Sequence, residues 1–246
     1  MSDLDKIMEL VADVEGWMSD GQARLLWDSA RTLAADDKVV EIGSFRGRSM
    51  AVLASAAPDG VELIAIDPHG GGDRGPGELT EDSIRGDADN ATFWANLKRC
   101  GVADRVRLVR QRSDDAHSEV AGPIDLLYID GAHRFGPARA DIAEWGARVA
   151  PGGTMLIHDS FNSVGVTGAQ VAELFFGKRF RYEGRSRSMT RYSRRDLSPA
   201  ARITNALRQG AELPYFVWAL WVKVMVSVGL GDLTRRAGNP EGSWPY

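Results

Sequence analysis

The chain of 246 residues has one cysteine, Cys100, so it cannot form a disulfide within itself. A sequence of this length without disulfides fits a reducing compartment. Residues 1–20 also lack the basic start and apolar run of a signal peptide, because they mix acidic and apolar positions. We therefore expect a protein of the cytoplasm.

The sequence also lacks an uninterrupted apolar run long enough to cross a membrane, and it has no excess of positive charge. The stretch Leu213–Gly231 comes closest to a span, but Lys223 lies near its middle, so no transmembrane segment is expected. We expect a helix buried in the core or at a homodimer interface, and peripheral contact with a membrane is the alternative. The net charge of −4 argues against general binding to nucleic acids, whose phosphates favour a cationic surface.

What the sequence does contain is a regular alternation of short apolar strands and helical patterns. The expected strands are Lys38–Gly43, Val61–Asp67, Arg105–Ser113, Ile124–Asp130 and Gly152–Asp159. The expected helices are Leu4–Val14, Gln22–Leu33, Ser49–Ala57, Phe93–Gly101 and Gly136–Val149. Nearly continuous apolar strands that alternate with helices are typical of an α/β protein, whose parallel sheet is covered on both faces.

Two segments interrupt this alternation. Pro68–Asn90 is glycine-rich and charged, and it leaves the carboxyl end of a strand, where ligands bind in open α/β sheets. We expect an active-site loop there, with disorder as the alternative. Lys178–Arg195 places Phe180 and Tyr182 between basic residues, which predicts one strand of a terminal hairpin with a solvated outer face. A site for an anionic substrate or partner is the alternative for this basic stretch.

The junction Glu41–Ser49 has the character of a ligand-binding turn between a strand and a helix. Gly43 and Gly47 would let a ligand approach the backbone, and the following helix points amide groups at it. Dinucleotide enzymes use the spacing G-x-G-x-x-G, whereas this turn has G-x-x-x-G, which counts against a dehydrogenase. Glu41, two residues before the first glycine, suits a ligand that carries an ammonium group.

Polar residues follow the next two strands. Asp67 ends the second strand, where a carboxylate can bind both hydroxyls of a ribose. Ser113 and Asp114 follow the third strand and are placed to line an adenine site, although Ser113 could instead cap a helix. Together with the glycine turn, these positions predict a nucleotide-like pocket.

Two more acids end the fourth and fifth strands, Asp130 and Asp159. If those strands are neighbours, the carboxylates lie side by side, and a cation such as Mg²⁺ would relieve their repulsion. Strand alternation would send His158 to the opposite side, so we interpret it as structural. His69 and His117 are expected to be surface or loop residues.

These motifs resemble those of class I S-adenosylmethionine (SAM)-dependent methyltransferases. The segment VVEIGSFRGRS is similar to the first motif of catechol-type O-methyltransferases. DLLYIDGAHRFGPARADI and PGGTMLIHDSF resemble segments of macrolide-sugar O-methyltransferases, and the resemblance covers roughly residues 16–176. It implies a Rossmann-like, doubly wound, seven-stranded sheet that is mostly parallel with a terminal antiparallel hairpin.

The resemblance also implies an organisation and a set of site residues. Residues 1–36 would form a helical substrate cap, 37–197 the SAM-binding core, and 198–246 a helical cap or dimer interface. The implied cofactor-binding residues are Glu41, Gly43, Ser44, Phe45, Gly47, Ser49, Asp67, Ser113, Asp114 and Asp130.

Metal and base positions follow from the same resemblance. Asp130, Asp159 and Ser160 would bind Mg²⁺, although Ser160 stands where the family has an amide, and Asn162 is the substitute. His133 occupies the position of the catalytic base, which is a lysine in catechol-type enzymes. An imidazole suits this role because its ordinary pKa is about 6.5.

The expected activity is SAM-dependent and Mg²⁺-dependent methylation of a saccharide hydroxyl, on a small molecule or an oligosaccharide. The composition resembles that of high-GC bacterial proteins, and such bacteria make methylated mannose polysaccharides. A mannoside O-methyltransferase is therefore the most specific expectation. The alternatives are an O-methyltransferase for catechols or other phenols, a dehydrogenase, and a docking protein for a membrane or partner with a vestigial nucleotide pocket.

Overall fold

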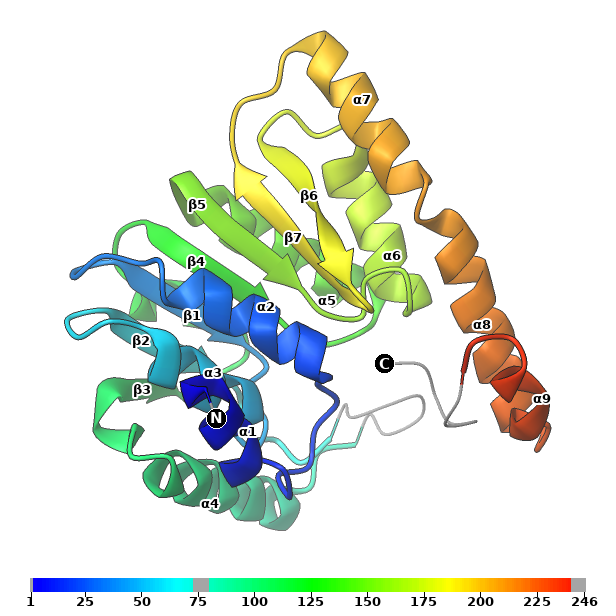
Figure 1. Ribbon diagram of the computed structural model, residues 1–246. Coiled ribbons are helices and arrows are strands. Elements are labelled where there is room, and N and C mark those ends of the chain that lie inside the picture. Colours follow the sequence, from blue (N-terminus) through cyan, green and yellow to red (C-terminus); the bar gives the residue numbers. More distant parts are fainter. Residues whose placement is uncertain (1, 73–79, 240–246) are drawn as a thin grey trace.

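A computed structural model describes residues 2–72 and 80–239 of the chain, and its centre is one seven-stranded sheet (Figure 1). The strand order is β3-β2-β1-β4-β5-β7-β6. The strands are β1 (Lys38–Ile42), β2 (Glu62–Ile66), β3 (Val106–Val109), β4 (Ile124–Ile129), β5 (Val149–Ile157), β6 (Phe180–Ser186) and β7 (Met189–Arg194). β1 to β5 pair in parallel, and β7 pairs antiparallel with both β5 and β6. This confirms the predicted fold class.

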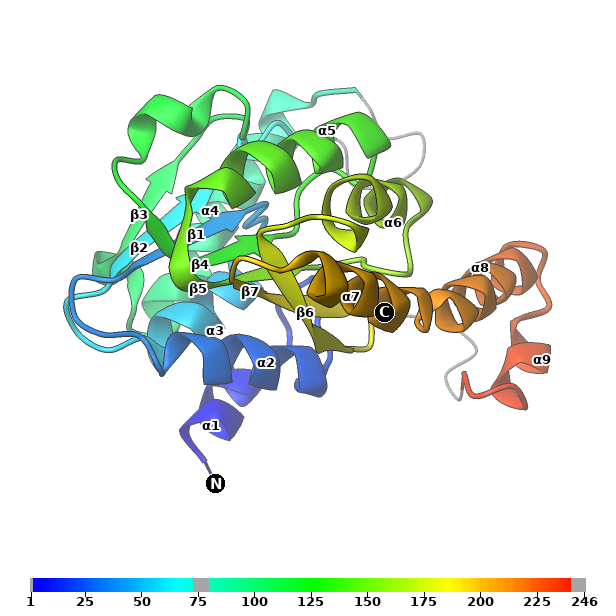
Figure 2. The ribbon, with the colours of Figure 1, turned by 90° about the horizontal axis from the view of Figure 1, so that it is seen from above.

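Helices cover both faces of the sheet, as Figure 2 shows from above. α1 (Asp3–Leu10), α2 (Asp20–Ala30), α3 (Arg48–Ala56) and α4 (Ser83–Arg99) share one apolar core with the sheet. α5 (Phe135–Ala140) and α6 (Val164–Gln170) contribute to a second core on the opposite face. Burial on both sides explains why the central strands are almost continuously apolar.

The basic stretch Lys178–Arg195 contains both strands of the terminal hairpin, whereas the sequence suggested only one. The chain reverses at Arg187, whose φ of 48° is left-handed. Phe180, Tyr182 and Tyr192 are buried beneath the hairpin. The turn was missed because Arg187 is neither glycine nor asparagine, the residues that usually adopt this conformation.

Several other boundaries differ from the sequence expectation. β3 ends at Val109 and not at Ser113. α4 begins at Ser83, because Asp82 caps it, so the end of the expected loop Pro68–Asn90 is helical, while residues 73–79 lie outside the described residues. The helix expected over Gly136–Val149 divides into α5, a π-helical turn and a 3₁₀ turn, and β5 begins directly afterwards at Val149.

The C-terminal part follows the hairpin edge of the sheet. α7 (Pro199–Gly210) and α8 (Leu213–Ser227) run one after the other along the outside, and α9 (Gly231–Arg235) closes the described chain (Figures 1 and 2). Across residues 2–72 and 80–239, no helix combines the length and the apolar character that crossing a membrane requires. The division into cap, core and appendage stays a prediction.

Candidate active site at the carboxyl edge of the sheet

The turn after β1 is shaped by contact between two strand ends. Gly43 has a φ of 84°, and a Cβ atom there would lie 2.1 Å from the backbone oxygen of Asp130. Only glycine therefore allows the ends of β1 and β4 to touch at this point. Gly47, with a φ of 82°, begins α3 as its N-cap. From the sequence, both glycines were expected to let a ligand approach the backbone. At Gly43 the backbone of Asp130 occupies that space instead.

Glu41 is a buried acid that has an unused oxygen. Its Oε1 atom accepts a 2.5 Å hydrogen bond from Ser49, while Oε2 is buried and has no partner among the described residues. Burial raises the pKa of Glu41 to about 8, although the hydrogen bond from Ser49 opposes this shift. A ligand ammonium would supply both the missing donor and a compensating charge.

Asp67 holds in place the loops that follow β1 and β2. Its Oδ2 atom accepts a hydrogen bond from the Phe45 amide at 2.8 Å, and Oδ1 accepts one from the His69 amide at 2.7 Å. Phe45 and His69 both have left-handed backbones, with φ of 44° and 45°. Because each carboxylate oxygen can accept two bonds, Asp67 keeps capacity for ligand hydroxyls.

His69 lies in the loop after β2, which agrees with the expectation of a surface or loop residue, but its side chain is buried. Its Nε2 atom lies 2.8 Å from the backbone oxygen of Phe45. His117, in contrast, is partly exposed and stacks on Trp145.

The predicted adenine border lies on a turn and not directly at a strand end. Ser113 and Asp114 precede the 3₁₀ turn Ala116–Glu119, and Asp115 is the residue at its N-cap. The buried carboxylate of Asp141 lies beside this turn. Burial raises the pKa of Asp141 to about 6, while a hydrogen bond with Ser113 opposes the rise. Asp141 was not predicted; the available signal was an acid beside the apolar residues Ile142 and Trp145 of the expected helix.

Asp130 and Asp159 converge as predicted, because β4 and β5 are parallel neighbours with Ile129 paired to Ile157. Tyr128 donates a hydrogen bond to Oδ2 of Asp130 at 2.9 Å. Nε2 of His133 lies 2.9 Å from Oδ2 of Asp159. One ligand atom from each of Asp130, His133 and Asp159 lies within 4.8 Å of the others, so these three residues could hold a metal ion.

His158 lies between the two acids, contrary to the expectation that it faces the other side. Its Nδ1 atom is 3.1 Å from Oδ1 of Asp130 and 3.4 Å from Oδ2 of Asp159. Strand alternation does not apply here because β5 ends at Ile157 and Asp159 has a left-handed φ of 53°. On the far side of the ring, Nε2 of His158 is 3.2 Å from the side-chain nitrogen of Gln22.

Charge coupling in this cluster is strong. Burial alone would lower the pKa of His158, but the two carboxylates outweigh it and raise this pKa well above its ordinary value. Burial would likewise raise the pKa of Asp159, but His158 and His133 hold it well below its usual range. The pKa of His133 is raised, because its contact with Asp159 outweighs burial. His158 and His133 are thus the two cationic partners of Asp130 and Asp159 in this cluster.

Ser160 does not fit the predicted role of third metal ligand. Its hydroxyl donates to the Ile157 carbonyl at 2.8 Å and accepts from Gln170 at 2.8 Å, with Thr190 at 2.7 Å. If Thr190 donates, both lone pairs of the Ser160 oxygen are in use. Asn162, the substitute, donates to Asp159 at 2.9 Å, and its Oδ1 atom is buried without a partner among the described residues.

Lys223 joins the C-terminal helix α8 to this cluster. Its Nζ atom donates a 2.9 Å hydrogen bond to the backbone oxygen of Asn162. Burial lowers the pKa of Lys223, while the charge of Asp159 opposes that shift. The sequence showed a lone cation in an apolar helix but could not show what it reaches.

Comparison with known proteins identifies the domain. Residues 40–160 match the model of a protein family described as a methyltransferase domain. The matched segment includes Asp130 and Asp159. Over these residues the chain is similar to a methyltransferase domain. This agrees with the prediction from the motifs, and the dehydrogenase alternative is set aside.

Solved structures with the same fold support this conclusion. A putative O-methyltransferase from Klebsiella pneumoniae is 16% identical, with a TM-score of 0.57 over 79% of this chain and 90% of that one. TomG, an O-methyltransferase from Streptomyces achromogenes involved in tomaymycin synthesis and solved with SAM, is 18% identical, with a TM-score of 0.52 over 79% and 90%. An O-methyltransferase from Bacillus cereus solved with SAH is 16% identical, with a TM-score of 0.53 over 78% and 90%. At these identities the similarity concerns the fold of the methyltransferase domain.

Proposed function

We propose that the protein transfers a methyl group from SAM to a hydroxyl of a saccharide, with Mg²⁺ held by Asp130 and Asp159. The observation that carries this proposal is the convergence of Asp130, His133 and Asp159 within 4.8 Å at the carboxyl edge of the sheet. This cluster adjoins the β1–α3 turn, since Gly43 packs against the backbone of Asp130. Cofactor and acceptor sites would therefore share one edge.

The residues of the β1–α3 turn fit SAM. The unpartnered Oε2 atom of Glu41 suits the ammonium of the methionine part, and Ser49 already holds the other oxygen in place. Asp67 would take the ribose hydroxyls while it keeps Phe45 and His69 in position. Ser113, Asp114 and Asp141 would border the adenine. Two solved structures with this fold contain SAM or SAH, which supports SAM as the cofactor.

The acidic cluster fits Mg²⁺, which prefers oxygen ligands and keeps several waters. Asp130 and Asp159 would hold the ion, and the free Oδ1 atom of Asn162 is the candidate for a third protein ligand. When bound, the ion would act as a Lewis acid toward the acceptor hydroxyl.

His133 is the proposed general base. Its Nε2 atom faces Asp159 at 2.9 Å, which leaves Nδ1 as the nitrogen that accepts a proton. Asp159 then orients the ring, as a carboxylate orients a catalytic histidine in other enzymes. The His133 side chain is 46% exposed, so an acceptor hydroxyl can approach it. Because the sulfonium methyl is already reactive, the remaining task of the chain is to align acceptor and donor.

The saccharide acceptor is the finer part of the proposal, with a mannoside as its most specific form. It rests on the resemblance of the Asp125–Ile142 and Pro151–Phe161 segments to sugar O-methyltransferases. A cation at this site would also suit two neighbouring hydroxyls, which sugars supply. Catechols supply the same pair, so a phenolic acceptor is the competing form.

The test is methyl transfer from labelled SAM to a panel of mannosides, other sugars and catechols, each assayed with Mg²⁺ and with EDTA. We expect Mg²⁺-dependent labelling of a sugar hydroxyl. If only catechols are labelled, the acceptor is a phenol and not a sugar, and the proposed methyl transfer to a hydroxyl still holds. SAM binding without transfer to any member of the panel would favour a docking protein with a vestigial pocket.

A further inference from the structure

A second pocket lies outside the proposed active site, where two helical segments end and β6 begins. Its walls come from the π-helical turn Asp141–Trp145 after α5, the π-helical turn Val171–Phe175 after α6, and the start of β6. We call it the hairpin pocket. π-Helical turns occur frequently at functional sites, and both of those found in residues 2–72 and 80–239 line this one pocket. Their convergence marks the hairpin pocket as a candidate ligand site.

The floor of the hairpin pocket is apolar. Ile142, Leu174 and Phe180 line it, and each is at most 6% exposed. Ala143 and Ala147 also line it, and their short side chains leave the space above the floor open. An apolar cavity of about 150 Å³ holds a benzene molecule. The hairpin pocket has a volume of about 220 Å³, so it has room for one ring or short chain and a small polar group.

Two cations, Lys178 and Arg179, line the hairpin pocket beside this floor. Their side chains are exposed and form no hydrogen bond or ion pair with the described part of the chain. The backbone that carries them is fixed, because the Lys178 oxygen accepts from the Leu197 amide at 2.8 Å and the Arg179 oxygen accepts from the Arg195 amide at 2.9 Å. Cations that are held in place without an internal partner are available to a ligand anion.

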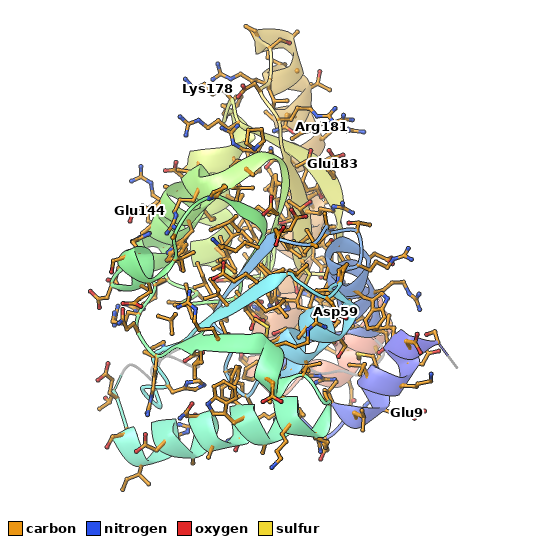
Figure 3. All side chains as sticks on the ribbon, turned by 90° about the vertical axis from the view of Figure 1, so that its left-hand side faces the viewer. Glu9, Asp59, Glu144, Lys178, Arg181 and Glu183 are labelled. Carbon is orange, nitrogen blue, oxygen red and sulfur yellow. The ribbon has the colours of Figure 1, made fainter. Side chains whose placement is uncertain are left out.

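The direction of Lys178 agrees with this role. Figure 3 shows Lys178 on the side of the molecule that also carries Glu144, a residue of the Asp141–Trp145 turn. Arg181, three residues further along the chain, lies on the other side of the hairpin in the same view. The basic stretch therefore divides its cations between two sides, and Lys178 belongs to the side of the hairpin pocket.

The negative groups of the lining are already paired. Glu173 is the one acid among the described residues that line the hairpin pocket, and it binds Nε of Arg139 at 2.6 Å. The backbone oxygen of Leu174, close to the end of its helix, accepts a hydrogen bond from Gln209 at 3.3 Å. The two cations are thus left without a balancing negative charge in the lining, and a ligand anion would supply one.

The hairpin pocket shares one wall with the proposed active site. Ile142 lines it and also lines the small pocket at Asp130 and His133, whereas neither Asp130 nor His133 lines the hairpin pocket. The residue before Ile142, Asp141, contacts the active-site side, since its Oδ2 atom would lie 3.3 Å from a Cβ atom at Gly131. A ligand in the hairpin pocket would therefore touch the same turn as the active site and leave the acidic cluster free.

We propose that the hairpin pocket binds a small organic anion, which consists of a ring or short hydrocarbon chain with one carboxylate. The apolar part would cover the floor, and the carboxylate would pair with Lys178 and Arg179. The basic stretch Lys178–Arg195 thus supplies its first two residues to a ligand site, while the rest forms the terminal hairpin. This proposal is independent of the methyl acceptor.

The test is a titration of the ¹⁵N-labelled full chain with phenylacetate, followed by the amide resonances. We expect saturable shifts at Ala143, Ala147 and Gly177, with a dissociation constant on the order of 1 mM, as suits so small a ligand. Phenylacetamide has the same shape without the charge and should bind about 5-fold to 10-fold more weakly. Repeating the titration with saturating SAM should leave the phenylacetate affinity within about 2-fold, because the cofactor pocket is separate.

Two variants separate the contributions of charge and space. Lys178→Met should weaken phenylacetate binding about 5-fold and leave phenylacetamide binding unchanged. Ala147→Phe should abolish the saturable shifts, because the added ring occupies the pocket, and the exposed position of Ala147 tolerates a larger side chain. Arg181→Gln is the matched control and should bind as the wild type does, since Arg181 lies on the other side of the hairpin (Figure 3). Circular dichroism melts would establish that each variant is folded.

Three results would overturn the proposal. Absence of saturable shifts at Ala143, Ala147 and Gly177 would exclude the site. Shifts at Gly43 and Gly131 that SAM abolishes, and that Ala147→Phe leaves unchanged, would place phenylacetate in the active site. Equal affinities for phenylacetate and phenylacetamide would show that the hairpin pocket does not select an anion.

Discussion

Lys223 and Asn162 join two parts of the chain that are far apart in sequence, through a 2.9 Å hydrogen bond from Nζ to the backbone oxygen. Asn162 in turn donates to Asp159 at 2.9 Å. The C-terminal helix α8 therefore supports the turn on which the proposed metal and base site depends. This relationship connects α8 to the proposed site.

We expect Lys223→Met to lower kcat by about 10-fold to 100-fold, the range found when residues that orient a metal site are removed. SAM affinity should be unchanged, because Lys223 bonds to the turn after β5, whereas Glu41 and Asp67, proposed to bind SAM, lie at the ends of β1 and β2. Steady-state kinetics and calorimetry separate the two effects. Lys98→Met, at an exposed lysine on α4, is the control. Equal losses in SAM affinity and kcat would instead indicate a general loss of structure.

Asp130→Asn and Asp159→Asn should each weaken divalent-cation binding by more than about 100-fold, because each removes a charged ligand from the cluster. Calorimetric titration with Mg²⁺ or Mn²⁺ measures this directly. Asp59→Asn is the matched control, since its side chain is fully exposed and it precedes β2, whereas the cluster lies at the carboxyl ends of the strands. Unchanged cation affinity in both cluster variants would remove the metal site from the proposal.

His133→Ala should lower kcat by about 10²-fold to 10⁴-fold, the usual contribution of a general base. SAM affinity should change little, because the His133 ring pairs with Asp159, which is not among the proposed cofactor residues. His117→Ala is the matched control. If His133→Ala instead abolished Mg²⁺ binding, His133 would be a ligand and the base would have to be another group.

Glu41 should make stability depend on pH. Its pKa is raised from 4.5 to about 8 in the folded protein, so the folded state keeps a proton that the unfolded state has lost. Stability therefore falls as pH rises from about 4.5 to about 8 and is level above that range, by an amount on the order of a few kcal/mol. Thermal melts at pH 6 and pH 9 should show this fall in the wild type and a smaller one in Glu41→Gln.

The same variant should bind SAM at least about 10-fold more weakly, because a neutral amide cannot balance the ligand ammonium. The thermal melts and the SAM affinity of Glu41→Gln together distinguish binding of the SAM ammonium from a role of Glu41 in packing alone. A variant with unchanged melts and unchanged SAM affinity would contradict both the burial of charge at Glu41 and its contact with the cofactor.

Sequence reasoning succeeded where strand geometry alone decides position. Asp67 and Asp130 directly follow β2 and β4, Asp159 comes two residues after the end of β5, and the carboxyl ends of parallel neighbours meet at one edge. The fold class and the convergence of Asp130 with Asp159 and His133 were predictable for this reason.

Sequence reasoning failed where the chain leaves helices and strands. His158 and Ser160 were misplaced because alternation ends at Ile157 and the left-handed Asp159 redirects the residues around it. Asp141 and Lys223 were missed because their positions depend on tertiary packing. A buried acid in a helix and a lone lysine in an apolar helix were the only signals available from the sequence.

The central claim is that Asp130 and Asp159 hold a divalent cation that methyl transfer requires. The most direct measurement is the rate of transfer from labelled SAM by metal-stripped protein, with Mg²⁺ then added in steps. We predict no turnover above background in EDTA and a saturable recovery with Mg²⁺. Full activity in EDTA would contradict the claim.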